Sequence, residues 1–296
     1  MSYWRAILLG LVQGLTEFLP ISSSGHLSVF QYFMGNSGDD VLLFNVLLHI
    51  GTLAAVFICF RQTIWHLIQE AIAFLRDIIK GEYSFKTIKE DFRSLNDKRK
   101  MLIYFVISCV PLLFMLLPAG GGESVMDKLS VFSTDDRILA EGVCFLLTGV
   151  ILILGALRAK NIRKYRKMDA LTAFFVGVAQ LFAAAFPGVS RSGSTISAGL
   201  LCGVSKKYMV QYSFILGIPA IIAANLSEMK DAIDMGSTLA VGPTIVGVLV
   251  AAVSGIAAIV LLRWILKKDI FQYFGYYCIA MGVFCLGATL VSSLNG

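Results

Sequence analysis

Long, unbroken runs of hydrophobic residues dominate the chain, and short polar segments separate them. Runs of this length can cross the roughly 30 Å hydrocarbon core of a bilayer as helices, whereas the strands of a membrane barrel would alternate apolar and polar residues. The pattern predicts an all-α polytopic membrane protein with six transmembrane helices in a single domain over residues 1–296. The expected spans lie near residues 41–60, 101–118, 138–157, 208–226, 239–262 and 270–294.

Two further hydrophobic regions, 3–35 and 169–204, are interrupted by polar residues near their middle. Each contains an apolar piece, a Pro-Ser-Gly break and a second apolar piece that is too short to cross a bilayer alone. Non-helical backbone is tolerated at membrane depth only where protein or water surrounds it. We therefore expect each region to form a re-entrant helical hairpin, as the broken helices of transporters do.

The two interrupted regions also resemble each other in sequence. Gln13 and Pro20 in the first region are matched by Gln180 and Pro187 in the second, at the same offset along the chain. A Ser-x-Ser-Gly sequence follows in both regions after a slip of one residue. The match predicts an internal repeat. Whether its two copies have the same or opposite orientation in the membrane is inferred from the charges of the loops.

Composition and charge agree with a membrane protein of defined orientation. Only 15% of the residues are charged and 57% are hydrophobic, against about 25% charged residues in soluble proteins. Four loops hold 20 of the 25 lysines and arginines, and the positive-inside rule makes these loops cytoplasmic. They are residues 61–100, 158–168, 205–207 and 263–269. The net charge of +6 therefore does not imply a nucleic-acid partner.

This orientation makes the first hairpin enter from outside the cell and the second from the cytoplasm, which is the arrangement of an inverted repeat. Full crossings at the two hairpins would instead scatter the basic loops over both sides. The largest loop, 61–100, begins with apolar residues at helical spacing and has Gly81 as a helix stop. We expect an interfacial helix there, with its basic side towards anionic headgroups.

The first interrupted region carries chemistry that lipid-facing segments do not tolerate. Gln13 and Glu17 are four residues apart and share one face of a helix. Pro20 ends that helix, and the following serines suit the N-cap of the next one. Free N–H groups at a helix N-terminus bind anions. His49, in the first full span, either lines this pocket or bonds to a carbonyl, and both alternatives remain open.

The second interrupted region supplies a matching serine-rich helix start together with Arg191. An arginine at membrane depth without a neighbouring acid in sequence needs an anion, and its planar fork suits phosphate. Two helix N-termini with Arg191 between them predict a cradle of phosphate size, in which Glu17 accompanies Arg191 and His26. The residues that we expect to bind the substrate are Gln13, Ser22, Ser24, Ser190, Ser192, Ser194 and Thr195.

The motifs QGLTEFLPISSSGH and PGVSRSGSTISAG resemble the two signatures of the bacitracin-resistance-type undecaprenyl pyrophosphate phosphatases. The similarity extends over essentially the whole chain and includes FNVLLHIGTLAAV after the first motif. It implies an enzyme of the bacterial inner membrane that hydrolyses undecaprenyl pyrophosphate to undecaprenyl phosphate and inorganic phosphate. Such an enzyme recycles the lipid carrier of cell-wall synthesis and confers bacitracin resistance. The expected orientation, with the mouth of the first hairpin on the outside, predicts a site that opens to the extracytoplasmic side.

The resemblance also assigns roles to individual residues. The family's acidic motif falls on Gln13 and Glu17, its serine nucleophile on Ser23, its histidine on His26 and its phosphate-binding arginine on Arg191. Other members carry Glu at the position of Gln13, so Glu17 is the one motif carboxylate left to hold the divalent cation, Mg²⁺ or Ca²⁺, that the family needs. Either His26 or Glu17 would activate Ser23, and direct attack by water is the competing route.

Two other classes of membrane protein share some of these sequence features. Membrane phosphatases that use a phosphohistidine need SRxxxxxH, and the residue six after Arg191 is Ser197, so this class is excluded. A transporter or flippase of an anionic polyprenyl lipid is the main alternative, because inverted repeats with broken helices are typical of transporters. The expected partners are the polyprenyl pyrophosphate and membrane lipids, with no nucleic acid. The oligomeric state is open, with a homodimer as one option.

Overall fold

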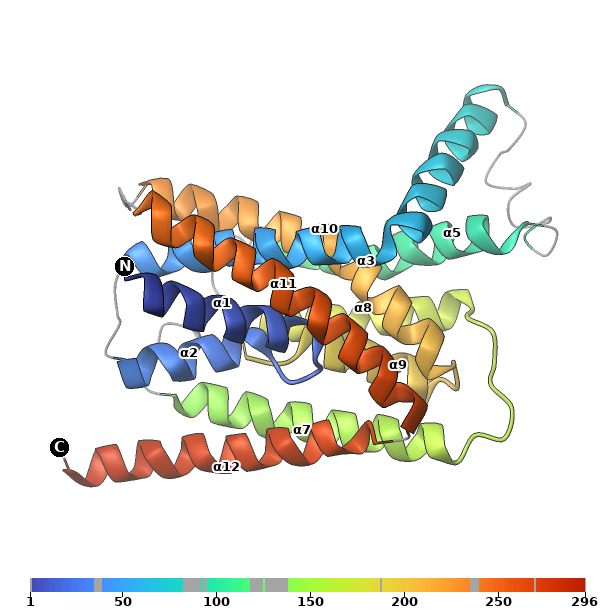
Figure 1. The fold of residues 1–296 in the computed structure, drawn as a ribbon. Coiled ribbons are helices and arrows are strands. Elements are labelled where there is room, and N and C mark those ends of the chain that lie inside the picture. The colour runs from blue at the N-terminus through green and yellow to red at the C-terminus, as the bar shows by residue number, and fades with distance from the viewer. Residues whose placement is uncertain are drawn as a thin grey trace.

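A computed structural model describes residues 2–34, 39–81, 92, 95–117, 125, 138–186, 188–234, 240–268 and 270–295. These residues are helical almost throughout, and they contain no strand beyond one isolated bridge between Arg166 and Val204. Figure 1 shows the helices side by side in one bundle, with both chain termini at the same end. The prediction of an all-α protein is confirmed for the described residues.

Five helices of the described chain are long and apolar enough to cross a bilayer, as a multi-pass membrane protein requires. They are α3 (Asp39–Ile79), α7 (Leu139–Lys160), α10 (Lys206–Asp234), α11 (Val241–Ile265) and α12 (Gln272–Asn295). The sixth expected span, 101–118, is instead divided between α5 (Asp97–Cys109) and the 3-10 helix η1 (Val110–Leu116). Pro111 lies at this change. Its ring removes a backbone hydrogen-bond donor and clashes with the preceding turn, so a regular α-helix does not continue through it.

The two interrupted regions form helical hairpins. The first is α1 (Tyr3–Phe18) with α2 (Ser23–Met34), and the second is α8 (Ala170–Ala185) with α9 (Arg191–Leu201). In Figure 1 the first hairpin extends from the end with the chain termini and the second from the opposite end. Their turns meet inside the bundle, where the N–H of Gly188 donates to Ser24 Oγ at 3.2 Å. Pro187, at the second predicted break, lies outside the described residues.

Glycines bring pairs of helices into close contact around the hairpins. A Cβ on Gly14 of α1 would overlap atoms of α11, so these two backbones approach as small-residue interfaces in membranes allow. Helices α7 and α12 contact each other reciprocally. A Cβ on Gly275 would lie 2.8 Å from the carbonyl of Gly149, and one on Gly282 would lie 2.8 Å from that of Gly142. The absence of a Cβ at these glycines lets the backbones of α7 and α12 approach closely along this stretch.

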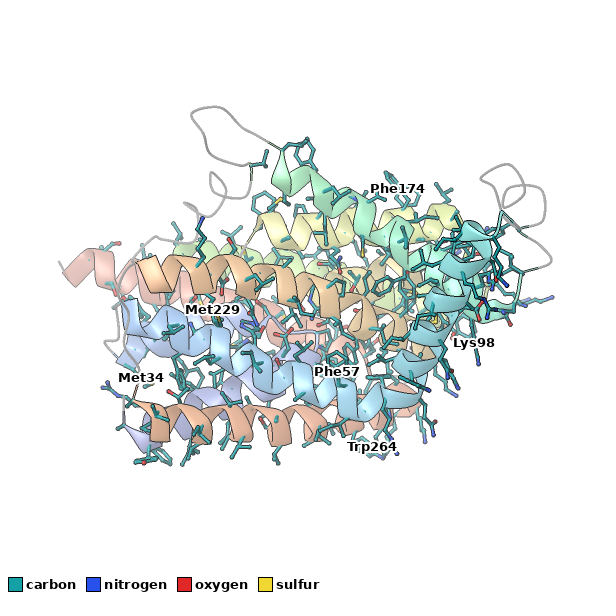
Figure 2. All side chains as sticks on the ribbon, turned by 90° about the horizontal axis from the view of Figure 1, so that it is seen from above. Met34, Phe57, Lys98, Phe174, Met229 and Trp264 are labelled. Atoms are coloured by element: carbon teal, nitrogen blue, oxygen red, sulfur yellow. The ribbon has the colours of Figure 1, made fainter. Side chains whose placement is uncertain are left out.

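The described basic segments gather at one end of the bundle, around the end of α7, the start of α10 and the end of α11 (Figure 1). In Figure 2 Lys98 and Trp264 lie at this end, whereas Met34 and Met229 lie at the other. The charge pattern of the sequence therefore corresponds to a physical separation in the fold.

Helix α3 changes direction at Phe60, where φ is −118° and ψ is 18°, and then extends away from the bundle (Figure 1). Its second part confirms the helix that the apolar spacing predicts from residue 61 onwards. Gly81 follows with φ of +76°, the left-handed conformation in which helices commonly stop. Arg99 of α5 holds this extension, because its Nε donates to Glu70 at 2.6 Å and its Nη2 to Asp77 at 3.1 Å.

Candidate active site

The first hairpin brings an amide, a carboxylate and a serine-rich turn together. Gln13 Nε2 donates to Glu17 Oε2 at 3.2 Å, as the spacing on α1 predicts. The helix ends at Phe18, and Ser22 caps α2, its Oγ accepting from the N–H of Gly25 at 3.2 Å. Ser22 has φ of +71°, a conformation that costs energy for a residue with a side chain. The contacts around the turn must therefore hold it in place.

The second hairpin has a similar serine cap. Ser190 Oγ accepts from the N–H of Gly193 at 3.0 Å, and the N–H of Ser190 donates to Thr148 Oγ1 of α7 at 3.1 Å. Arg191 is then the first residue of α9. Both predicted caps are confirmed, so two helix N-termini begin at the turns where the hairpins meet. Such ends carry partial positive charge and unpaired N–H groups, which favour anions.

Glu17 connects the two hairpins. Arg191 Nη2 donates to Glu17 Oε1 at 2.8 Å, and Ser23 Oγ donates to Glu17 Oε2 at 2.6 Å. The side chains of Glu17 and Arg191 are only 6% and 19% exposed. Removing one member of a pair with so little exposure would leave the other charge without compensation. The structure thus joins a serine hydroxyl, a carboxylate and a guanidinium in one continuous chain of hydrogen bonds, as the sequence predicted for Glu17 and Arg191.

His49 combines the two roles that the sequence left open. Its Nδ1 lies 3.0 Å from the carbonyl of Asn45, one turn earlier in α3, and its Nε2 lies 3.9 Å from Glu17 Oε2. The ring is therefore held by its own helix and directed at the carboxylate.

His26, one of the two groups expected to activate Ser23, contacts other groups instead. Its Nδ1 lies 2.6 Å from the carbonyl of Ser22, and its Nε2 lies 2.7 Å from the hydroxyl of Tyr277 on α12. The ring also contacts Phe145 edge-on, with centroids 5.0 Å apart. Both nitrogens are therefore engaged, and Glu17 is the group that accepts the hydrogen bond of Ser23. Tyr277 lies 251 residues from His26, and no sequence pattern pointed to it.

Helix α10 supports Arg191 from the other side. Arg191 Nη1 donates to the carbonyl of Ser213 at 3.4 Å. A Cβ on Gly217 would overlap the same nitrogen, so only glycine leaves room for the guanidinium there. Gly217 is a second residue that the sequence analysis missed, because its importance arises from a contact with another helix.

The remaining predicted binding residues of α9 bond mostly within the protein. Thr195 Oγ1 donates to the carbonyl of Arg191 at 2.9 Å and lies 2.6 Å from Ser213 Oγ. Ser192 Oγ lies 3.4 Å from Ser190 Oγ. The Thr195 contact therefore joins the start of α9 to α10, and the Ser192 contact lies within the cap of α9. Their binding to a substrate stays a prediction.

Two predicted binding groups have unused hydrogen-bonding capacity. Gln13 Oε1 and Ser194 Oγ are buried and have no hydrogen-bond partner among the described residues. Such groups are uncommon in folded proteins, since an unmet buried polar atom costs about 1–3 kcal/mol. Ser194 can donate a hydrogen bond to an anion, whereas Gln13 Oε1 needs a donor such as water.

Glu17 is the predicted ligand of a divalent cation, and the side chains described around it bear on how such a cation could bind. The described residues contain no group of three or more His, Cys, Asp or Glu side chains placed to hold a metal ion. Glu17 is the carboxylate of the site, and its two oxygens already accept from Arg191, Ser23 and Gln13. Mg²⁺ and Ca²⁺ prefer several oxygen ligands, although Mg²⁺ is often held by one carboxylate plus substrate phosphates. The donor set fits a cation that arrives with a diphosphate better than one bound beforehand.

Comparison with known proteins extends the similarity over nearly the whole chain. An undecaprenyl-diphosphatase of Alkaliphilus metalliredigens is 35% identical over 283 residues, which cover 95% of this chain and 97% of that protein. Undecaprenyl-diphosphatases of Halothermothrix orenii and Desulfatibacillum aliphaticivorans are 36% and 35% identical, over 96% and 98% of this chain and 96% and 100% of those proteins. The family model described as bacitracin resistance protein BacA matches residues 6–284. The chain belongs to the BacA family of bacitracin resistance proteins.

Proposed function

We propose that this protein hydrolyses undecaprenyl pyrophosphate to undecaprenyl phosphate and inorganic phosphate, and so recycles the lipid carrier of cell-wall synthesis and confers bacitracin resistance. Family membership supports this activity, because relatives covering nearly the whole chain are undecaprenyl-diphosphatases. The single observation that carries the chemistry is the hydrogen-bonded chain Ser23–Glu17–Arg191 at the meeting point of the hairpins. It combines a nucleophile, a proton acceptor and a phosphate-binding cation.

In the first step Ser23 Oγ attacks the terminal phosphorus of the diphosphate. The Oγ–P bond forms as the bridging P–O bond breaks, and the lipid monophosphate leaves with that electron pair. Glu17 takes the serine proton, because Ser23 Oγ already donates to its Oε2 at 2.6 Å. Arg191 and the N–H groups at the starts of α2 and α9 stabilise the charge on the phosphoryl oxygens, which is the main requirement of phosphoryl transfer.

In the second step water attacks the phosphoserine, and the Ser23 Oγ–P bond breaks to release inorganic phosphate. Glu17 returns its proton to Ser23 Oγ and accepts one from the attacking water. In the competing route Glu17 activates water for direct attack on the diphosphate, and Ser23 only positions it. Replacing Ser23 by alanine abolishes the first route and leaves the second.

A divalent cation, Mg²⁺ or Ca²⁺, is proposed to enter as a complex with the diphosphate, with Glu17 as its protein carboxylate. When bound, it would neutralise phosphate charge. Removal of divalent cations with EDTA should lower phosphate release, and Mg²⁺ or Ca²⁺ should restore it. Activity unchanged after exhaustive chelation would contradict this part of the proposal.

The site is proposed to lie in the bacterial inner membrane between two re-entrant hairpins and to open to the extracytoplasmic side. The gathering of basic segments at one end of the bundle supports this orientation. A row of buried aromatic rings lies between Glu17 and the basic end and supports the proposal that the site is closed on that side. Phe18, next to Glu17 in sequence, contacts Phe214 with centroids 5.4 Å apart, and Phe214 contacts Phe60 at 5.9 Å. Because these rings fill the space towards the basic end, the diphosphate headgroup would enter from the end with the chain termini.

Phosphate release by purified protein in detergent tests the proposed activity. With a polyprenyl pyrophosphate as substrate, the protein should release inorganic phosphate, and Arg191→Lys should reduce the rate about 100-fold, since lysine lacks the planar fork. The matched control is Arg158→Lys, at an exposed arginine near the end of α7, and it should retain the rate. A transporter or flippase would release no phosphate in this assay, because it breaks no phosphate bond and detergent provides no membrane between two compartments.

A further inference from the structure

A cavity of about 640 Å³ lies at the basic end of the bundle, between the bend of α3, the start of α10 and the end of α11. Five of the residues that line it are basic, and no aspartate or glutamate is among its described lining residues. The basic residues are Arg61, Lys206, Lys207, Arg263 and Lys267. Like charges around one cavity repel each other, so an anion bound among them would be strongly favoured.

The bend of α3 positions the two arginines of this cavity. Where α3 leaves helical geometry at Phe60, Arg61 Nη1 donates to the carbonyl of Ile58 at 3.4 Å and Arg263 Nη2 donates to the carbonyl of Cys59 at 3.3 Å. The guanidinium of Arg263 also lies 4.5 Å from the centre of the Phe60 ring. A guanidinium has five N–H groups, so each of these carbonyl contacts leaves most donors of the arginine for a ligand.

The walls of the cavity combine this charge with apolar and neutral polar groups. Phe60, Val210 and Leu266 line it beside the basic residues. Gln211 Nε2 donates to Thr63 Oγ1 at 2.8 Å, which bridges α10 and α3 within the lining. A ligand with an anionic head and an apolar body would match both kinds of wall.

Tryptophans indicate that the cavity lies at the level of lipid headgroups. Trp264, next to Arg263 at the end of α11, is 50% exposed, and Trp65, shortly after the bend of α3, is 59% exposed. The ammonium group of Lys268 lies 4.1 Å from the centre of the Trp264 ring. Exposed tryptophans beside basic residues are typical of the boundary between hydrocarbon and water.

We propose that this cavity is a second phosphate site of the protein, which binds the phosphate group of an anionic lipid headgroup. It is distinct from the site at Glu17, because the buried rings of Phe18, Phe214 and Phe60 lie between the two. The proposal therefore does not depend on the proposed hydrolysis. A free phosphate ion shares the same chemistry, and the experiment separates the two sources.

The test is binding of phosphatidylglycerol to the purified full chain in neutral detergent, followed by native mass spectrometry. The cavity variant carries Arg61→Gln, Lys207→Gln and Lys267→Gln, all at exposed positions. Its affinity should fall roughly 100-fold, because several charge-assisted hydrogen bonds are lost together. Diacylglycerol with the same chains, which lacks the phosphate, should not bind at this site.

The matched control carries Lys160→Gln, Arg163→Gln and Lys164→Gln, which remove the same charge from exposed positions at the same end but outside the cavity. It should retain phosphatidylglycerol affinity, and phosphate release by both variants should stay near the unmodified rate as a check of folding. The single change Lys207→Gln provides a milder variant if the triple variant is unstable.

Sodium phosphate added as a competitor distinguishes the two sources. Displacement only at concentrations far above that of the lipid supports a lipid headgroup, whereas displacement at similar concentrations supports free phosphate as the ligand of the same site. An equal loss of affinity in the cavity and control variants would overturn the proposal, because it would indicate general surface attraction. Unchanged affinity in the cavity variant, or equal binding of diacylglycerol, would overturn it as well.

Discussion

Glu17→Gln separates the two tasks that the structure gives to this carboxylate. The amide keeps the size of the side chain, but it cannot take the proton of Ser23 and it carries no charge for Arg191. Both contacts are short, at 2.6 Å from Ser23 and 2.8 Å from Arg191. The variant therefore tests whether proton transfer or ion pairing is the main contribution of Glu17.

The expected loss of rate follows from the first contact. General-base catalysis contributes about 10²–10⁴ to a rate, which corresponds to roughly 3–5.5 kcal/mol of activation free energy. The second contact predicts a separate loss of stability. A buried charge left unpaired costs about 3–5 kcal/mol. We expect about 2 kcal/mol here, because Arg191 is 19% exposed and the amide oxygen still accepts a hydrogen bond.

Substrate affinity should change much less than the rate. The neutral amide removes the group that competes with the diphosphate for Arg191, but it also removes the carboxylate that would hold the cation, so the two effects on KM oppose each other. Phosphate release from a polyprenyl pyrophosphate, measured over a range of concentrations in detergent, gives kcat and KM separately. Thermal unfolding followed by circular dichroism gives the loss of stability.

Glu70→Gln is the matched control. It makes the same chemical change in a carboxylate that accepts from Arg99 at 2.6 Å, far from the hairpin turns. It should lower stability without lowering kcat. A Glu17→Gln protein that folds and keeps kcat within about tenfold of the unmodified protein would refute the role of Glu17 as proton acceptor. A KM that rises as much as kcat falls would instead indicate that holding the diphosphate and its cation is the main contribution of Glu17.

Three further substitutions test the supports of the site. Gly217→Ala should lower kcat about 100-fold in the phosphate-release assay, because its Cβ overlaps Arg191 Nη1 and displaces the guanidinium. Gly287→Ala, where no atom lies within 4 Å of the added Cβ, should leave the rate unchanged. Tyr277→Phe should lower kcat by about tenfold, since His26, which contacts the turn through the carbonyl of Ser22, loses one hydrogen bond; an unchanged rate would show that this hydrogen bond does not position the turn. Gly14→Ala should destabilise the protein by about 1–3 kcal/mol in thermal unfolding, because α1 and α11 must separate, and an unchanged midpoint would contradict that packing.

Local sequence rules predicted the parts of the site that lie within one hairpin. The spacing of Gln13 and Glu17 predicted their contact, and the serines after each break predicted the caps at Ser22 and Ser190. These features depend only on helix periodicity and on the needs of a helix N-terminus. They could therefore be inferred without knowledge of the fold.

Contacts between distant segments were harder to infer. The pairing of Glu17 with Arg191 was expected because both are polar groups at membrane depth. The orientation of His26 was not, because Tyr277 on α12 determines it. The break of the expected span 101–118 had a visible signal in Pro111, which the continuous hydrophobic run obscured. The bend at Phe60 had no such signal.

Phosphate release by Ser23→Ala, measured in detergent with a polyprenyl pyrophosphate, tests the central claim most directly. The claim is that the hydroxyl bound to Glu17 becomes joined to phosphorus during turnover. We predict a rate at least about 1,000-fold below that of the unmodified protein, with the fold retained, because no other described hydroxyl donates to Glu17. Turnover by Ser23→Ala within about tenfold of the unmodified rate would contradict the claim and assign the attack to water.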